Sequence, residues 1–185
     1  MRKVYLFMMI SLDGFFEGVN HSLDWHNVDA EFNEFSSEQL DNTGTLLFGR
    51  RTYEVMAAYW LTEDAKKDDA VIGAKMNAIP KLVFSETLNT ASWEHTTLVS
   101  ENIGDAVTKL KQEEGTDIGI FGSNNVTMHL IEKGLVDEFR IMINPVILGG
   151  GTLFCTGILN RLNLQLLSTK TFTSGNVLLQ YVLKK

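Results

Sequence analysis

The chain has 185 residues, of which 44% are hydrophobic and 21% are charged, and its formal net charge is −7. This length and composition predict one globular domain over residues 1–185. The acidic balance argues against general binding to nucleic acid or anionic membranes, because a basic surface supplies most of that affinity. The single cysteine, Cys155, excludes an intrachain disulfide. No apolar run approaches the ~18 residues that span a bilayer, so we expect a cytoplasmic protein.

The first half of the chain predicts alternating strands and helices. Val4–Ile10 is a nearly continuous apolar run, as in a central strand buried on both faces, and a glycine-containing loop follows over Ser11–Asn20. Helical spacing of apolar residues and short apolar runs identify the next elements. We expect helices over Asp29–Leu40, Tyr53–Trp60 and Lys66–Ala78, and strands over Thr45–Phe48, Lys81–Ser85 and Thr96–Val99.

The second half continues this alternation and ends in a β-hairpin. We expect helices over Ile103–Glu114 and Asn125–Glu132, strands over Asp117–Phe121 and Val136–Val146, and a loop over Leu148–Gly151. Two β-rich runs, Leu164–Thr173 and Asn176–Leu183, meet at a glycine-containing turn. The order predicts an α/β fold with a mixed, mainly parallel sheet, helices on both faces and an antiparallel hairpin. An exposed hairpin edge favours a homodimer.

The stretch Leu46–Tyr53, Leu-Leu-Phe-Gly-Arg-Arg-Thr-Tyr, is the most informative part of the sequence. A strand stops at Gly49, and Arg50, Arg51 and Thr52 stand where a helix begins. A helix N-terminus offers free N–H groups and partial positive charge, and guanidinium groups match phosphate oxygens. The stretch therefore predicts a site for a phosphorylated cofactor. The alternative is a surface turn with solvated arginines.

Two further strand ends carry polar groups that suit phosphate. One strand ends at Ser85, and another runs into a helix start, which comprises Gly122, Ser123, Asn124, Asn125 and Val126. Ligands of open α/β sheets lie outside the carboxyl ends of the strands. We expect a dinucleotide to stretch across these ends, with its pyrophosphate on the helix start and an NADP 2′-phosphate near Ser85. Glu86 must then point away from the phosphate.

Four segments, taken in order, resemble the dihydrofolate reductase-like superfamily. They are Ser11-Leu-Asp-Gly14, Leu47–Tyr53, Gly134–Glu138 and Asn144–Gly150. The sequence is most similar to the branch typified by the C-terminal reductase domain of the bifunctional riboflavin-biosynthesis deaminase/reductase. This resemblance spans nearly the whole chain. It implies a three-layer fold and an NADPH-dependent reductase of a small pyrimidine or pterin, such as 5-amino-6-(5-phosphoribosylamino)uracil, whose ribosyl group becomes ribityl.

The resemblance also implies site residues, with two departures. The family holds the cofactor phosphates on a Gly-Arg-x-Thr turn, here Gly49–Thr52, and on a later glycine-bearing turn, here Gly122–Asn125. Ser123 replaces a second glycine that the family usually has. Asn124 and Asn125 stand where riboflavin-type reductases tend to carry an acid, which weighs against the riboflavin substrate. Substrate is implied between the loop Asp13–Gly18, the first helix and the nicotinamide, and we expect it to contact Phe15, Trp25 and Phe32.

Two carboxylates are candidates for catalysis. Dihydrofolate reductases place an acid on the first helix, where burial raises its pKa for proton donation. Spacing does not single out one of Asp29, Glu31 and Glu34; we take Glu31 as the candidate, with a solvated helix face as the alternative. Asp13 follows a buried strand, where catalytic groups tend to lie, although Asp before Gly also forms turns.

The sequence leaves two alternative functions open. One is dihydrofolate reductase activity, and the other is nucleotide binding without turnover, in a sensor or an assembly module. The four histidines lack metal-ligand spacing, so we expect no metal site.

Overall fold

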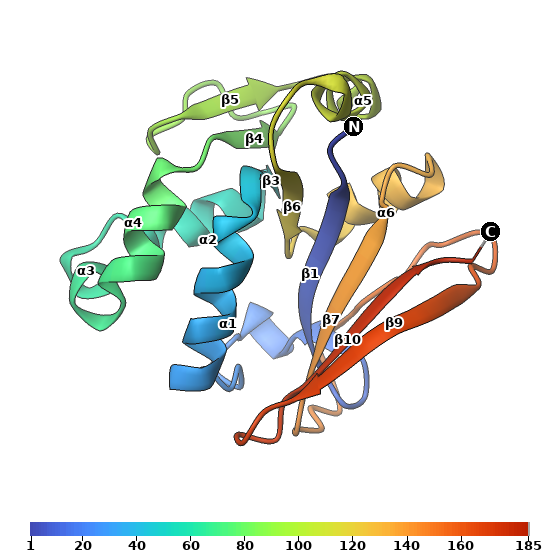
Figure 1. The fold of residues 1–185 in the computed structure, drawn as a ribbon. Helices are drawn as coiled ribbons and strands as arrows, with labels where there is room; N and C mark the ends of the chain where they lie inside the picture. The colour runs from blue at the N-terminus through green and yellow to red at the C-terminus, as the bar shows by residue number, and fades with distance from the viewer. Residues whose placement is uncertain (185) are drawn as a thin grey trace.

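The computed structural model describes residues 1–184, apart from the side chains of Lys66 and Asp68. Within these residues, the main sheet has eight strands in the order β5-β4-β3-β6-β1-β7-β10-β9. Figure 1 shows helices packed around this sheet and the β9–β10 hairpin extending from one side. The strands are β1 (Val4–Ser11), β3 (Thr43–Gly49), β4 (Lys81–Phe84), β5 (Thr96–Val99), β6 (Asp117–Phe121), β7 (Glu138–Asn144), β9 (Leu164–Thr171) and β10 (Val177–Leu183).

The sheet is mainly parallel, as the sequence predicts. Every neighbouring pair from β5 to β7 is parallel, and β10 pairs antiparallel with both β7 and β9. Successive strands from β5 to β7 therefore end at the same edge of the sheet. Polar side chains that follow these strands are brought together at this carboxyl edge.

Helices cover both faces of the sheet and complete a three-layer α/β fold. Core residues of α1 (Ala30–Asp41), α2 (Arg50–Trp60) and α4 (Ala70–Ala78) pack on one face, and those of α5 (Ile103–Gln112) and α6 (Asn124–Glu132) pack on the other. Each fully buried apolar side chain of such a core stabilises the fold by about 1.5–3 kcal/mol. None of the helices in the described residues has the length and apolar character that a membrane crossing requires.

Strand β1 lies at the centre of the sheet because it is apolar on both faces. Tyr5, Phe7 and Met9 join the core cluster on the α1 side, whereas the alternating residues Val4, Leu6 and Met8 join the cluster on the α6 side. The continuous apolar run that predicted a central strand is thus divided between two cores.

The structure corrects two of the predicted elements. The segment Lys66–Ala78 is not one helix, because α3 (Glu63–Asp68) and α4 are separated at Asp69, whose φ and ψ are −151° and 75°. The Asp69 carboxylate caps α4 by accepting a hydrogen bond from the Ile72 N–H. The helix predicted over Tyr53–Trp60 begins earlier, at Arg50.

The predicted loop Ser11–Asn20 also contains regular structure. It holds the strand β2 (Phe15–Glu17) and part of a 3-10 turn (Val19–His21), and β2 pairs antiparallel with β8 (Thr152–Leu153). The backbones approach so closely that a Cβ on Gly151, whose φ is +132°, would lie 2.1 Å from the Glu17 carbonyl oxygen. We refer to residues 15–21 and 148–153 together as the flap.

Candidate functional site

Two helix starts lie side by side at the carboxyl edge of the sheet and are bonded to one another. They belong to α2 and α6, which follow the neighbouring strands β3 and β6. The Gly49 N–H donates to Ser123 Oγ at 2.9 Å, and the Ser123 N–H donates to Thr52 Oγ1 at 3.1 Å. These reciprocal bonds bring the two predicted phosphate turns into one site. In these bonds Ser123 Oγ and Thr52 Oγ1 act as acceptors, so each hydroxyl keeps its O–H donor.

Close packing explains the glycines in both turns. A Cβ on Gly49 would lie 3.1 Å from Val126 Cγ2, so Val126 packs against the turn of α2. Gly122 has a φ of +65°, and a Cβ there would meet Thr52 Cγ2 at 3.4 Å. Ser123 also has a left-handed backbone, with φ and ψ of 57° and 55°. Ser123, which stands in place of a second glycine, thus adopts a left-handed conformation that glycine favours.

Both helix starts have backbone N–H groups available to an anion. Within the part of the chain that the structure describes, the N-caps of α2, α5 and α6 make no side-chain hydrogen bond, whereas α1, α3 and α4 are each capped by a side chain. The Thr127 N–H donates to Ser123 O at 3.0 Å, which leaves the N–H groups of the preceding residues, Asn124, Asn125 and Val126, without a helical acceptor. The dipoles of both helices add positive potential at this edge.

The neighbouring side chains Arg50 and Arg51 point in opposite directions along the edge. Arg50 Nη1 donates to Thr87 Oγ1 at 2.7 Å, in the loop after β4, and Arg50 Nε donates to Glu54 at 2.7 Å. Arg51 Nη2 lies 3.1 Å from Oε2 of Glu17 in the flap. Arg50 therefore marks the β4 side of the site, and Arg51 marks the side that contains β6 and β1.

Ser85 shapes the turn on the β4 side. Its hydroxyl accepts hydrogen bonds from the N–H groups of Thr87 and Leu88 at 3.2 and 2.9 Å, and the residue is buried. Its neighbour Glu86 is exposed. Ser85 thus holds Thr87 in position, and Thr87 itself contacts Arg50. The sequence reasoning missed Thr87, although it lies only two residues beyond the predicted site residue.

Asp13 fastens the loop after β1 to the loop after β7. Its carboxylate accepts hydrogen bonds from Ser11 Oγ at 2.7 Å and from the N–H groups of Leu148 and Gly149 at 3.1 and 2.8 Å. The Ser11 hydrogen bond, together with those backbone bonds, lowers the pKa of Asp13 to about 2. Asp13 is therefore ionised at neutral pH and has no proton to donate. These contacts favour its alternative interpretation as a turn residue.

Glu31 connects α1 to the turn of the C-terminal hairpin. Its Oε2 accepts hydrogen bonds from the Thr173 N–H at 2.8 Å and from Thr173 Oγ1 at 2.9 Å. Among the other acids considered on this helix, Asp29 is the N-cap and accepts from the Phe32 N–H. The structure thus gives Asp29 a capping role and places Glu31 between two elements.

The three aromatic residues expected at the substrate occupy different environments. Phe32 is buried and lies with Phe7 and Phe35 in the core, with ring centroids 6.3 and 6.5 Å away. Phe15 is half-buried on β2. Trp25 Nε1 donates to Ser22 O at 3.1 Å, and its ring stands edge-on to His26. Phe15 and Trp25 remain partly accessible, whereas Phe32 packs chiefly against protein.

Sequence reasoning missed Glu17, a buried carboxylate in the flap. Glu17 accepts hydrogen bonds from Thr152 Oγ1 at 2.6 Å and from His21 Nδ1 at 2.8 Å, and it contacts Arg51. Burial by itself would raise the pKa of Glu17, but these two hydrogen bonds and the charge of Arg51 outweigh it and lower the pKa. An acid in an otherwise apolar run, Phe15-Phe16-Glu17, was the available signal.

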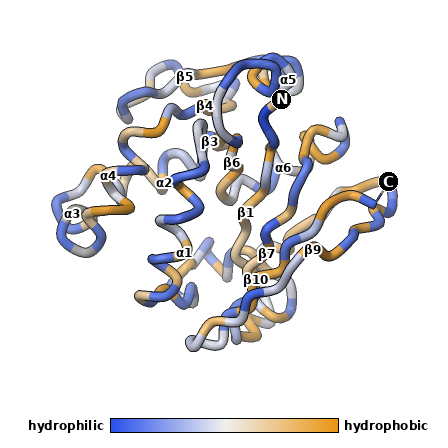
Figure 2. Tube along the Cα trace, viewed as in Figure 1, coloured by the Kyte–Doolittle hydropathy of each residue, from blue (hydrophilic) through white to orange (hydrophobic). Residues whose placement is uncertain are grey.

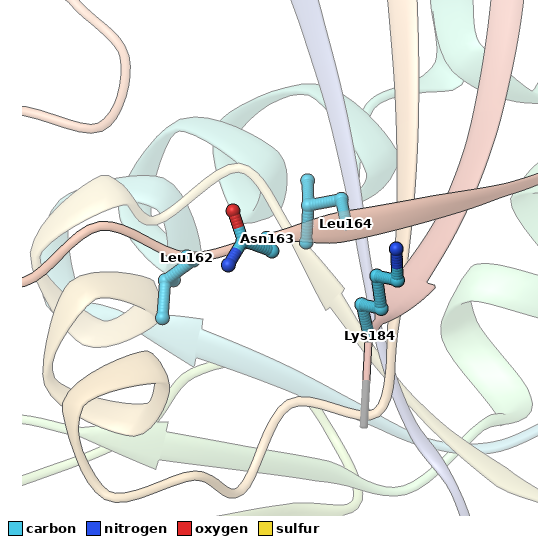
Figure 3. Close-up of a pocket in the computed structure, with 4 residues that line it drawn as sticks. All are labelled: Leu162, Asn163, Leu164 and Lys184. Atoms are coloured by element: carbon cyan, nitrogen blue, oxygen red, sulfur yellow. The ribbon is translucent and has the colours of Figure 1, made fainter.

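Two hollows in the described residues lie away from this edge. One, of about 650 Å³, is formed by the segment entering β9 and the segment leaving β10 (Figure 3), with lining residues Leu162, Asn163, Leu164 and Lys184. The other, of about 430 Å³, is mainly apolar and includes Cys155. Burial raises the pKa of the Cys155 thiol to about 11. Neither hollow includes a predicted site residue, so we place the candidate site where the polar groups converge.

Comparisons with known proteins agree with this fold. The family described as the RibD C-terminal domain matches residues 2–178. The uncharacterized protein YyaP of Bacillus subtilis is 33% identical over 182 residues, which is 97% of this chain and 94% of that protein. The uncharacterized protein YwjB of the same organism is 30% identical over 182 residues, which is 98% of this chain and 98% of that protein.

Solved structures show the same architecture at lower identity. A putative riboflavin biosynthesis protein from Shewanella sp. PV-4 superposes with a TM-score of 0.77 at 20% identity, with 99% of each chain covered. A diaminohydroxyphosphoribosylaminopyrimidine deaminase/5-amino-6-(5-phosphoribosylamino)uracil reductase from Thermotoga maritima superposes with a TM-score of 0.70 at 13% identity. That match covers 99% of this chain and 57% of the longer one.

Proposed function

Because the chain belongs to the RibD C-terminal domain family, we propose that it is an NADPH-dependent reductase of a small heterocyclic substrate. The observation that carries the proposal is the joined pair of helix starts at the carboxyl edge, with Arg50 and Arg51 directed to its two sides. The N–H groups and guanidinium groups of this edge suit the phosphates of a dinucleotide.

The proposal gives different parts of the coenzyme to different residues. Arg50 and Thr87, on the β4 side, would hold the 2′-phosphate that distinguishes NADPH from NADH. The start of α6 would hold the pyrophosphate, and the nicotinamide would lie toward β1 and the flap. The bound coenzyme supplies the hydride, while the protein orients the reactants and excludes water.

The proposed substrate is a pyrimidine or a pterin that lies between the flap and the start of α1. The riboflavin-type substrate, 5-amino-6-(5-phosphoribosylamino)uracil, is supported by the kinship with riboflavin-pathway reductases. Asn124 and Asn125 weigh against it. Glu31 is the better candidate for a proton donor, because Asp13 is held as a carboxylate by its loop contacts.

A panel assay tests the proposed activity. The purified protein is mixed with NADPH and, in turn, with dihydrofolate, other pterins and ribosylaminopyrimidines, and the loss of NADPH absorbance is followed. We expect oxidation with at least one member and its reduced product by mass spectrometry. Methotrexate-sensitive turnover of dihydrofolate would instead identify the dihydrofolate reductase alternative.

One observation favours a second candidate function, in which the site binds the nucleotide without turnover. The two acids that the sequence proposed for catalysis both make structural contacts, Asp13 with the loop after β7 and Glu31 with Thr173. A sensor or an assembly module would need the phosphate turns but no proton donor. Tight NADPH binding without oxidation by any panel member would support this candidate and exclude reduction of the panel substrates.

A further inference from the structure

Glu17 joins the flap to the first turn of α2. It is 6% exposed, and its Oε1 accepts hydrogen bonds from two flap residues, Thr152 and His21. Its Oε2 lies 3.1 Å from Arg51 Nη2, and Arg51 Nη1 approaches Oε1 at 3.5 Å. A buried carboxylate requires such partners, because leaving a charge unpaired away from water is costly. Glu17 therefore constrains where the Arg51 guanidinium can lie.

Arg51 keeps donors that Glu17 does not use. A guanidinium group has five N–H donors, and the contact with Glu17 occupies only one edge of it. The Arg51 side chain is 53% exposed, so the remaining donors are accessible to a ligand. Glu17 can hold Arg51 while Arg51 also binds an anion.

The neighbouring arginine provides a contrast within the same turn. Arg50 pairs with Glu54 one helical turn away, and both side chains are about half exposed, at 49% and 46%. Exposed ion pairs of this kind contribute little to stability and orient their side chains only weakly. The partner of Arg51, Glu17, is instead buried, and its backbone packs closely against Gly151.

We propose that Glu17 is a positioning residue that holds Arg51 toward the pyrophosphate of the coenzyme, and that coenzyme bound through Arg51 steadies the flap. This inference rests on the proposed function. Arg51 follows β3 and is directed toward the β1 side of the edge. Strand β6 lies between β3 and β1, and the helix that follows it, α6, begins with free N–H groups. The pyrophosphate is common to NADPH and NADH, so Glu17 acts on both coenzymes alike.

A double-mutant cycle on coenzyme affinity tests this proposal. NADPH and NADH dissociation constants are measured for the native protein, E17Q, R51A and the double variant. We expect E17Q to weaken both coenzymes about 10-fold, and to change affinity less than about 2-fold in the R51A background, because it acts through Arg51. A purely structural role of Glu17 would instead weaken binding equally in both backgrounds, and that result would overturn the proposal.

Matched variants and hydrogen exchange complete the experiment. E54Q removes the charge that pairs with Arg50 and is expected to change both affinities less than about 2-fold. NADPH is expected to slow amide exchange in residues 15–21 and 148–153 of the native protein but not of R51A. If E17Q does not fold, E17D takes its place in the cycle, because aspartate keeps the negative charge but moves it away from Arg51. Tighter binding by E17Q would show that Glu17 competes with the coenzyme and would also overturn the proposal.

The outcomes distinguish this proposal from the proposed function. Native protein that binds neither coenzyme would overturn both. Two other results would overturn only the role of Glu17. In both, the native protein binds NADPH, and either E17Q has no effect on affinity or the effects of E17Q and R51A add.

Discussion

The environment of His26 differs strongly from that of a free histidine side chain in water. Its Nε2 atom is buried and has no hydrogen-bond partner among the described residues, and burial lowers the pKa of the imidazole to about 4. The unfolded chain has an ordinary histidine pKa of about 6.5. As pH falls below that value, the unfolded state binds a proton before the folded state does. The contribution of neutral His26 to stability is therefore fully present above about pH 6.5 and is lost as the pH falls toward 4.

We predict that replacing His26 by Phe removes part of the acid sensitivity of the fold. Near pH 5, the native protein should lose about 2 kcal/mol of unfolding free energy through this residue relative to neutral pH, and His26→Phe should not show that loss. Urea unfolding at neutral and acid pH measures the difference. His95→Phe, at an exposed position, is the control. Parallel pH profiles for the native protein and His26→Phe would contradict the prediction.

Individual site residues can be proposed from the sequence where the chemistry is local. Arg50 and Gly122 stand in short motifs at strand ends, and their residue types indicate phosphate directly. The contact between Glu17 and Arg51 was not predictable, because it joins residues 34 positions apart whose proximity depends on the sheet order. The contacts of Asp13 depend likewise on a loop 135 positions away.

At the scale of elements, the tie between α1 and the hairpin offers a test of Glu31. If its carboxylate donates a proton to the substrate, E31Q should lower kcat about 100-fold or more on the substrate that the panel identifies. Thr173→Val removes one hydrogen bond to Glu31 but leaves the carboxylate, and it should change kcat only a few-fold. Steady-state kinetics, with thermal unfolding of each variant, make the comparison. Equal and small effects of both changes would assign Glu31 a structural role.

Long periodic elements were predicted well, and short ones were missed for a physical reason. The flap strands β2 and β8 have three and two residues, and they exist through pairing with each other rather than through local propensity. The break between α3 and α4 was missed because the segment is rich in helix-favouring residues. Asp69 was the available signal, because its side chain competes as an N-cap.

At the scale of the whole molecule, the open edge of the sheet predicts self-association. Strand β9 is last in the sheet order, all of its residues are exposed, and Figure 2 shows hydrophobic stretches along the β9–β10 hairpin. Leu164 and Leu166 are opposite Leu183 and Tyr181 in the strand pairing, and the apolar cavity of about 430 Å³ is lined by Leu164 and Tyr181. We therefore propose a homodimer that buries this side of the hairpin.

Light scattering tests the dimer. We predict a mass near twice that of the chain for the native protein and a shift to the monomer for Leu166→Lys, because the lysine would be buried in the contact. Gln165→Lys, on the opposite face of the same strand, should leave the dimer intact. A native protein that is monomeric at high concentration would exclude the proposal.

The sheet order connects these scales. The parallel arrangement of β4, β3, β6 and β1 places the Arg50 turn between the β4 loop on one side and the α6 start on the other. The alternation of strands and helices predicted this class of fold, and the ordered motifs implied its family. The sequence did not reveal which side of the edge each arginine faces, and that arrangement underlies the proposed binding of NADPH.

Calorimetric titration of the native protein and R50A with NADPH and NADH tests the central claim most directly. The native protein should bind NADPH more tightly than NADH. R50A should weaken NADPH about 10-fold or more and change NADH less than about 2-fold, because Arg50 would meet only the 2′-phosphate. Absence of binding to either coenzyme at millimolar concentration, or equal weakening of both by R50A, would contradict the assignment of this edge to NADPH.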